Sequence, residues 1–105
     1  MPETTKFKIL EIILQNRHAG FDAMRVALMS SLPEMSWEQI SSFVVLLAKD
    51  GYLKNLRGDD DVQGILVQPD ALARLYEAKE TVKGEKAKEI IDRILRLVPL
   101  AGKIL

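Results

Sequence analysis

The sequence predicts a mostly helical α+β fold built as one domain, and three observations lead to that expectation. The chain has 105 residues, of which 48% are hydrophobic, which is enough for one hydrophobic core but not for two. Apolar residues recur every three or four positions over most of the chain, which is the period of an amphipathic helix. That period breaks between residues 52 and 67, where short apolar runs flank a polar segment that contains glycine.

Two helices are expected before residue 33. The first should begin after Thr4 or Thr5, because either hydroxyl can accept a hydrogen bond from a free backbone N–H, and it should end near Asn16. A second helix is expected to begin at a cap formed by Asp22 and to stop before Pro33, since the residue preceding a proline avoids the helical region. The apolar face of the first helix comprises Phe7, Ile9, Leu10, Ile12, Ile13 and Leu14.

The third helix has the clearest boundaries. Ser36 at the cap and Gln39 three residues later match a capping box, in which each side chain accepts a hydrogen bond from the other residue's backbone N–H. The helix should end at Asp50 and Gly51, because glycine readily adopts the left-handed conformation that closes a helix. Its expected buried stripe is Ile40, Phe43, Val44 and Leu47.

A hairpin and one more helix are expected next. Residues 52–56 and 64–67 read as two short strands, joined by an acidic turn that includes residues 59–61. Pro69 is expected at the first position of the following helix, where proline is best tolerated, and Gly84 should interrupt that helix.

The last expected helix covers Glu85 to Val98. Glu89 with Arg93, and Asp92 with Arg96, have the i,i+4 spacing of ion pairs on its solvent side. Its apolar stripe, with Ile90, Ile91, Ile94, Leu97 and Val98, either folds back on the first helix to complete the core or pairs with a second copy of the chain. Residues 83–105 carry six basic against three acidic residues and end in an apolar tail, so attachment to a membrane surface is a third alternative.

The order of these elements resembles that of the winged helix-turn-helix superfamily. Residues 46–53 (LLAKDGYL) resemble the end of the third helix in that superfamily, and residues 66–75 (LVQPDALARL) resemble the second wing strand leading into the next helix. Gln68 and Ala71 stand where the superfamily's pattern has threonine and glycine. Over residues 5–100 the chain is similar to the small YjcQ-like winged-helix proteins of bacteria and their phages.

This resemblance implies a single winged-helix domain with a two-stranded wing. The winged-helix core would span residues 5–82, and residues 83–105 would form a C-terminal helical extension with an apolar tail. By association with the superfamily it also implies DNA binding, although a fold does not by itself determine function.

The surface that would meet a partner carries little positive charge. Residues 36–67 hold three basic against five acidic residues. Because contacts between basic side chains and phosphates dominate affinity for duplex DNA, this balance disfavours DNA binding through that surface. Two hypotheses follow: a small DNA-binding transcription regulator of phage or prophage origin, acting as a homodimer, and a winged-helix module that binds a protein without binding DNA. The candidate contacts are Trp37, Glu38, Ser41, Ser42, Val45 and Lys49 on the third helix, with Lys54 and Arg57 on the hairpin. For Trp37 the alternative role is packing in the core.

Composition argues against several other classes of protein. The chain has no cysteine, which excludes disulfides and thiolate metal sites and fits a cytoplasmic location. It has one histidine, His18, in an expected loop and no motif that supplies a nucleophile, so we expect no enzymatic activity, cofactor or metal. The acidic run at 59–61 lacks the alternating spacing of a calcium-binding loop and reads as a solvated turn. No apolar run approaches the 18 residues of a membrane-spanning helix.

Overall fold

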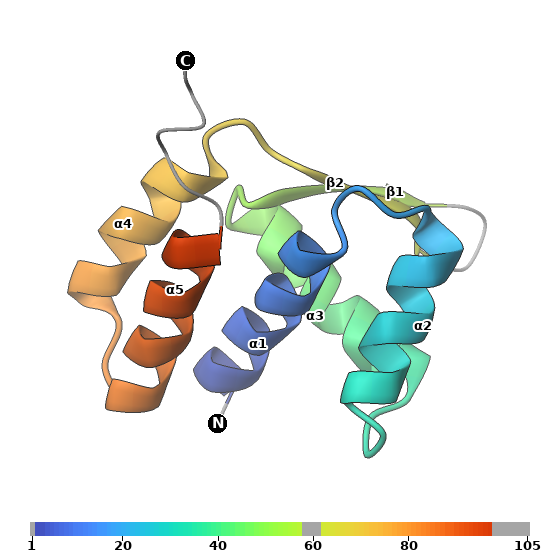
Figure 1. The fold of residues 1–105 in the computed structure, drawn as a ribbon, viewed down its shortest axis with the longest axis horizontal. Helices are drawn as coiled ribbons and strands as arrows, with labels where there is room; N and C mark the ends of the chain where they lie inside the picture. Colours follow the sequence, from blue (N-terminus) through green and yellow to red (C-terminus); the bar gives the residue numbers. More distant parts are fainter. Residues whose placement is uncertain (1, 58–61, 98–105) are drawn as a thin grey trace.

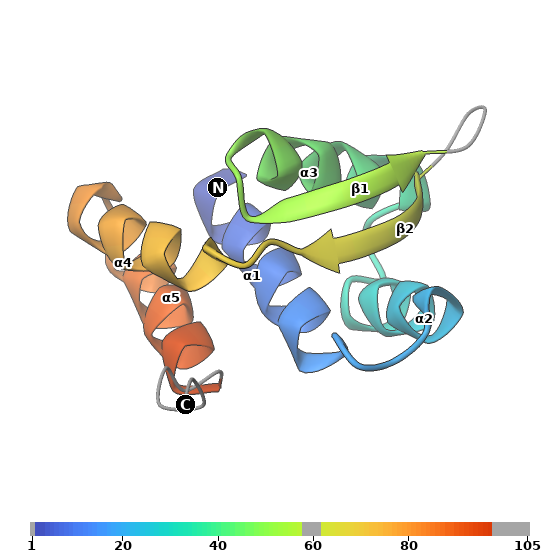
Figure 2. The ribbon, with the colours of Figure 1, turned by 90° about the horizontal axis from the view of Figure 1, so that it is seen from above.

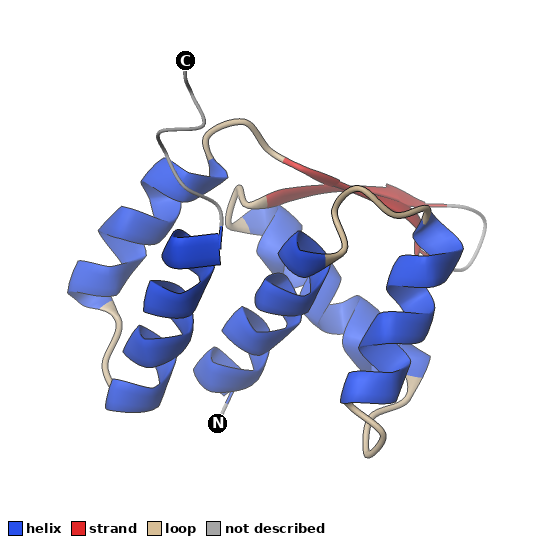
Figure 3. Ribbon diagram, viewed as in Figure 1, coloured by secondary structure: helices blue, strands red, loops and turns tan. Residues whose placement is uncertain are grey.

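The helices and the hairpin occur in the predicted order (Figure 1 and Figure 3). The computed structural model describes residues 2–57 and 62–97, and within these ranges the chain is mostly helical with one two-stranded antiparallel sheet. Its elements are α1 (Pro2–Gln15), α2 (Phe21–Ser31), α3 (Trp37–Lys49), β1 (Leu53–Arg57), β2 (Val62–Val67), α4 (Ala71–Thr81) and α5 (Glu85–Leu97).

Helix α1 lies at the centre of this arrangement. Helix α3 packs against one side of α1 and α5 against another, so that α1 separates them (Figure 2). Helix α4 packs against α5, and the hairpin lies across one end of the helices (Figure 1). One cluster of buried side chains joins all five helices to β1, and its fully buried members include Ile13, Leu28, Leu47, Leu53, Leu75 and Ile91.

The hairpin has one apolar and one solvent-facing side. Leu53 lies opposite Val67 and Lys54 lies opposite Leu66, in antiparallel register. Because successive side chains of a strand point to opposite faces, the first pair packs on the core and the second pair faces solvent. The acidic turn expected at 59–61 lies outside the described residues.

Both predicted boundaries of α3 are confirmed. The Gln39 backbone N–H donates to the Ser36 hydroxyl oxygen at 3.2 Å, and the Ser36 N–H donates to the Gln39 side-chain oxygen at 2.8 Å, which completes the capping box. At the other end Gly51 has φ of 93°, a left-handed conformation that favours glycine. A Cβ at this position would also lie within 3 Å of the Arg74 side chain, so a larger residue would displace that guanidinium.

The predicted starts of α1 and α2 are wrong. Helix α1 begins at Pro2 and includes both threonines, because proline has no N–H to leave unsatisfied and its φ suits the first turn. Helix α2 is capped by Gly20 in an extended conformation, with no side-chain hydrogen bond, and Phe21 rather than Asp22 is its first residue. Phe21 packs against the core, and this tertiary contact extends the helix beyond the local signal.

The predicted start of α4 is also wrong. Pro69 lies in a turn before the helix, in which the Ala71 N–H donates to the Gln68 carbonyl at 3.1 Å. Proline is favoured at the second position of such a turn for the same fixed φ that favours it in a first helical turn, so the sequence signal fits both places. The predicted interruption at Gly84 is confirmed, with φ of 102° between α4 and α5.

Helix α5 forms its ion pairs with neighbouring helices rather than within itself, contrary to the predicted i,i+4 pairs. Arg93 donates from Nε and from one Nη to the two carboxylate oxygens of Glu11 on α1, each at 2.8 Å. Asp92 pairs with Lys79 on α4. These partners are 82 and 13 positions away in the sequence, so local spacing does not reveal them.

Candidate functional site

One side of α3 faces away from the core and carries three of the predicted contact residues, Glu38, Ser42 and Lys49. Glu38, Ser42, Leu46 and Lys49 follow one another at the spacing of a helical face, and all four are exposed. We call these four residues the outer strip of α3. The opposite side of the helix holds Trp37, Ile40, Val44 and Leu47, which are buried.

The outer strip is mixed in character, with one acid, one base and an apolar centre. The Ser42 hydroxyl donates to the Glu38 backbone carbonyl at 3.1 Å, so it is partly occupied within the helix. Leu46 exposes 47% of its surface, whereas large apolar side chains are usually buried. Lys49 takes part in none of the ion pairs found among the described residues. One cation on four positions is little positive charge for a surface that would contact phosphates.

Ser41 and Val45 border this strip without belonging to it. Both are half-buried. The Ser41 hydroxyl oxygen is inaccessible to solvent and has no hydrogen-bond partner within the described part of the chain. Because its hydroxyl is buried, Ser41 contributes less to the candidate surface than its sequence position suggests.

Trp37 lies on the inner side of α3 and packs in the core. It is 8% exposed, its ring meets Phe21 of α2 edge to face at a centroid separation of 6.0 Å, and the Arg25 guanidinium lies 4.7 Å from its centre. These contacts fix the start of α3 against α2. Of the two roles considered for Trp37, core packing is the one its surroundings match.

The hairpin adds two exposed side chains on its outer face. Lys54 and Leu66 are direct partners in the register, and Leu66 is 54% exposed. Arg57 is the last residue of β1, and its side chain lies outside the described part of the chain.

The C-terminal end of α3 is anchored by a small charged cluster. Lys6 on α1 donates to the Asp50 carboxylate at 2.8 Å and lies 3.4 Å from Glu3. Burial alone would lower the pKa of Lys6, but the hydrogen bond and the two carboxylates more than offset it, so the pKa is raised. For the neighbouring Tyr52 hydroxyl, whose charged form is the anion, burial instead raises the pKa. Because the Asp50 carboxylate is paired with Lys6, its negative charge beside the outer strip is offset.

The basic residues of α5 do not join those of α3 and the hairpin. Lys86, Arg93 and Arg96 are exposed on α5, which packs on a different side of α1 from α3 (Figure 2). Positive charge is therefore divided between separate faces of the described structure, so α5 does not reinforce Lys49 and Lys54. Electrostatic attraction to one duplex needs such charges on one face.

The apolar stripe of α5 packs within its own chain. Ile90, Ile91 and Ile94 are buried against α1 and α4, and Leu97 is half-buried. Val98, predicted with them, lies outside the described residues. A second copy of the chain could therefore not reach these isoleucines without displacing α5.

Two residues, Leu46 on the outer strip and Glu11 on α1, were not among those predicted from the sequence. Leu46 is adjacent to the buried Leu47, but its angular position on the helix places it beside Ser42, so helical periodicity could have identified it. Glu11 is 7% exposed within an apolar run, and no local signal predicts Arg93 as its partner.

The described residues contain no group of three or more His, Asp or Glu side chains placed to hold a metal ion. None of the described helices combines the length and apolar character needed to cross a bilayer. In comparisons with protein-family models, with curated proteins and with solved structures, nothing matches this chain.

Proposed function

We propose that this chain is a winged helix-turn-helix protein with a two-stranded wing and a C-terminal helical extension, and that it binds a protein partner through the outer strip of α3. The order of elements supports the fold: three helices, a capped third helix that leads into a hairpin, and a further helix after it. A cysteine-free chain is compatible with function in the cytoplasm.

One observation favours a protein partner over DNA: the outer strip carries little positive charge and exposes a large apolar side chain, Leu46. The outer strip presents one cation, Lys49, and the described side chains of the hairpin present one more, Lys54. Each lies near an exposed leucine: Leu46 is on the same strip as Lys49, and Leu66 is the cross-strand partner of Lys54. Two phosphate contacts would make affinity for DNA fall only about tenfold between 50 and 200 mM salt, compared with about 1,000-fold or more for proteins that make six to ten. Apolar side chains ringed by polar groups are instead typical of protein interfaces.

The proposal is tested by crosslinking from the strip in the living cell. A photoreactive amino acid at Ser42 should crosslink one protein, and the same amino acid at Glu80, exposed on α4, should not. The identified partner is then purified, and Leu46→Glu should weaken its affinity at least about tenfold, because it places a charge in a desolvated contact. Tyr76→Glu, a matched change at an exposed side chain on α4, should leave the affinity unchanged. Equal crosslinking from both positions, or a partner whose affinity ignores Leu46→Glu, would reject the proposal.

DNA binding is the second candidate, and the two exposed lysines at the end of α3 and on the hairpin favour it. A fluorescence anisotropy titration with a mixed-sequence 30-base-pair duplex at 50 mM salt distinguishes the two functions. On the protein-binding proposal we expect no saturable binding at micromolar protein. Submicromolar binding that weakens with Lys49→Ala and Lys54→Ala would establish a DNA-binding regulator in its place.

A further inference from the structure

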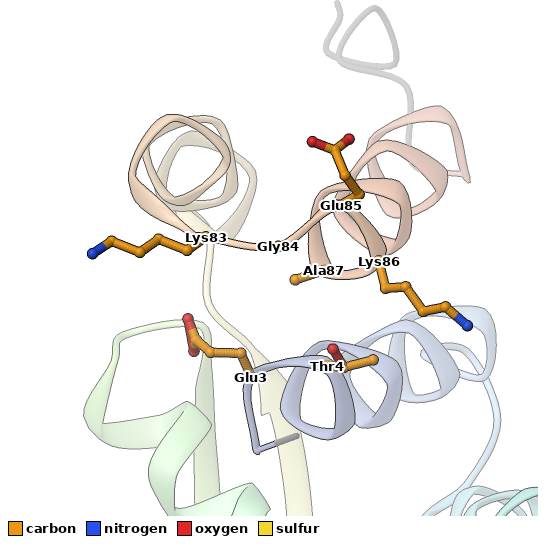
Figure 4. A pocket seen from close by; sticks show the side chains of 7 residues that line it. All are labelled: Glu3, Thr4, Lys83, Gly84, Glu85, Lys86 and Ala87. Carbon is orange, nitrogen blue, oxygen red and sulfur yellow. The ribbon is translucent and has the colours of Figure 1, made fainter.

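Two adjacent hollows lie along the seam between α1 and α5. The larger has a volume of about 540 Å³ and is bounded by the first turns of α1 and by the loop that opens α5 (Figure 4). The smaller, of about 230 Å³, lies further along the two helices. Thr4 and Lys86 line both, so the two hollows adjoin. The larger hollow is also lined by Lys83, Gly84 and Ala87, and the smaller by Lys8, Glu89 and Arg93.

The larger hollow has mainly apolar walls. Figure 4 shows the Ala87 side chain between the loop at Gly84 and the start of α1, while the ammonium groups of Lys83 and Lys86 point away from one another toward opposite sides. A Cβ at Gly84 would meet no atom within 4 Å, so the space beside this loop is open. The volume lies in the range of small-molecule sites, and such walls suit the hydrocarbon part of a ligand.

The smaller hollow is rich in cations. Lys8 and Lys86 take part in no ion pair among the described residues. Arg93 uses two of its five N–H groups on Glu11 and keeps the others, on a side chain that is 48% exposed. Glu89 is the one acidic side chain in this lining, so a single added carboxylate would find more positive than negative charge around it.

We propose that the α1–α5 seam binds a monoanionic amphiphile, specifically a free medium-chain carboxylate such as decanoate. Its hydrocarbon chain would lie in the larger hollow, and its carboxylate would meet Lys8, Lys86 and Arg93 in the smaller one. Thr4 and Lys86, shared by both hollows, would lie beside the join between chain and head group. This site is separated from the outer strip of α3 by α1, so it does not depend on the function proposed for that strip.

The test is a titration of the full-length, ¹⁵N-labelled protein with straight-chain carboxylates of six to twelve carbons, each below its micelle concentration. Saturable shifts should concentrate at residues 3–8 and 83–93, and Kd should fall about three- to fourfold for each added methylene until the larger hollow is full. Decanol should bind more weakly than decanoate, and decylammonium more weakly still, because the head-group site is cationic. The same spectra report whether each variant is folded.

Charge and volume variants locate the two ends of the ligand. The double variant Lys8→Gln/Lys86→Gln should weaken decanoate binding about fivefold or more and leave decanol unchanged, whereas Lys49→Gln, one lost lysine on α3, should change neither. Thr4→Leu should weaken both ligands by filling the shared wall. The proposal is rejected by the absence of saturable binding up to dodecanoate, by equal affinity for decanoate and decylammonium, or by an unchanged decanoate affinity in the double variant. Binding to anionic phospholipid vesicles without any response to decanoate would also reject it.

Discussion

Helices α3 and α5 have the same length but are held in place by different means. The ends of α3 carry local boundary signals, the Ser36–Gln39 capping box and Gly51, in addition to the tertiary contacts of Trp37 and Asp50, and one of its faces stays open to solvent. Helix α5 buries its isoleucines against α1 and α4, and its two ion pairs reach to those same helices. Both helices bury one face in the core, but the boundaries of α3 are marked by its own sequence, whereas the ion pairs of α5 depend on residues of other helices.

The largest expected effect comes from breaking the packing of α5. Ile91 is fully buried, so Ile91→Ala should lower the free energy of unfolding by about 3 kcal/mol, through lost transfer free energy and the cavity left behind. Leu46→Ala on the outer strip of α3 should change it by less than about 0.5 kcal/mol. Urea denaturation monitored by circular dichroism measures both, and similar losses for the two variants would contradict the exposure of the outer strip and the burial of Ile91.

The next largest effect concerns the ion pair between α5 and α1. Arg93→Met should cost about 2 kcal/mol, because it leaves the Glu11 carboxylate buried without a partner; half-exposure of Arg93 keeps the loss below that of a fully buried pair. Arg96→Met, one turn removed and exposed, is the matched control and should be nearly neutral. Adding Glu11→Leu to Arg93→Met should recover most of the lost stability, since the stranded charge is then gone. A double variant no more stable than Arg93→Met alone would show that Glu11 is not the source of the loss.

Features set by residues close together in the sequence were predictable, and features set by contacts between helices were not. The boundaries of α3, the hairpin and the interruption at Gly84 depend on residues within four positions of one another, and these predictions are confirmed. The starts of α1, α2 and α4 were misplaced, because Pro2, Phe21 and Pro69 take roles that tertiary contacts or a turn decide. The partners of Arg93 and Asp92 lie on other helices, and the i,i+4 rule describes only an isolated helix.

The candidate site was predictable to a similar extent. Helical periodicity correctly placed Glu38, Ser42 and Lys49 on one exposed face. It could not assign Trp37, because a residue in the first turn is buried or exposed according to what packs beside it, here Phe21 and Arg25. Nor could it show that α1 separates α3 from the cations of α5, since charges distant in sequence meet or separate only in the folded chain.

A smaller effect is expected from the local signal that begins α3. Ser36→Ala removes one side of the capping box and should lower the free energy of unfolding by about 1 kcal/mol. Ser30→Ala, at an exposed position near the end of α2, should change it by a few tenths of a kcal/mol at most. Because the capping box acts on the first turn of α3, Ser36→Ala should also increase amide hydrogen exchange in that turn while leaving α5 unaffected. Equal changes in both helices would indicate that the start of α3 is held by packing instead.

The smallest expected effect is a loss of stability at alkaline pH, which arises where the C-terminal end of α3 meets α1. The pKa values of Lys6 and Tyr52 are both raised in the folded chain, Lys6 because its contacts with Asp50 and Glu3 outweigh its burial and Tyr52 because of burial. A group whose folded pKa is raised stabilises the fold below its unfolded pKa, so this contribution is complete at neutral pH and is lost as pH rises beyond about 10. Tyr52→Phe keeps the edge-to-face contact with Phe7 and removes the titrating hydroxyl, so its unfolding free energy should fall less steeply above that pH than that of the parent chain. The difference should be smaller than the cost of Ser36→Ala, and identical alkaline slopes would show that the pKa of Tyr52 is not raised by folding.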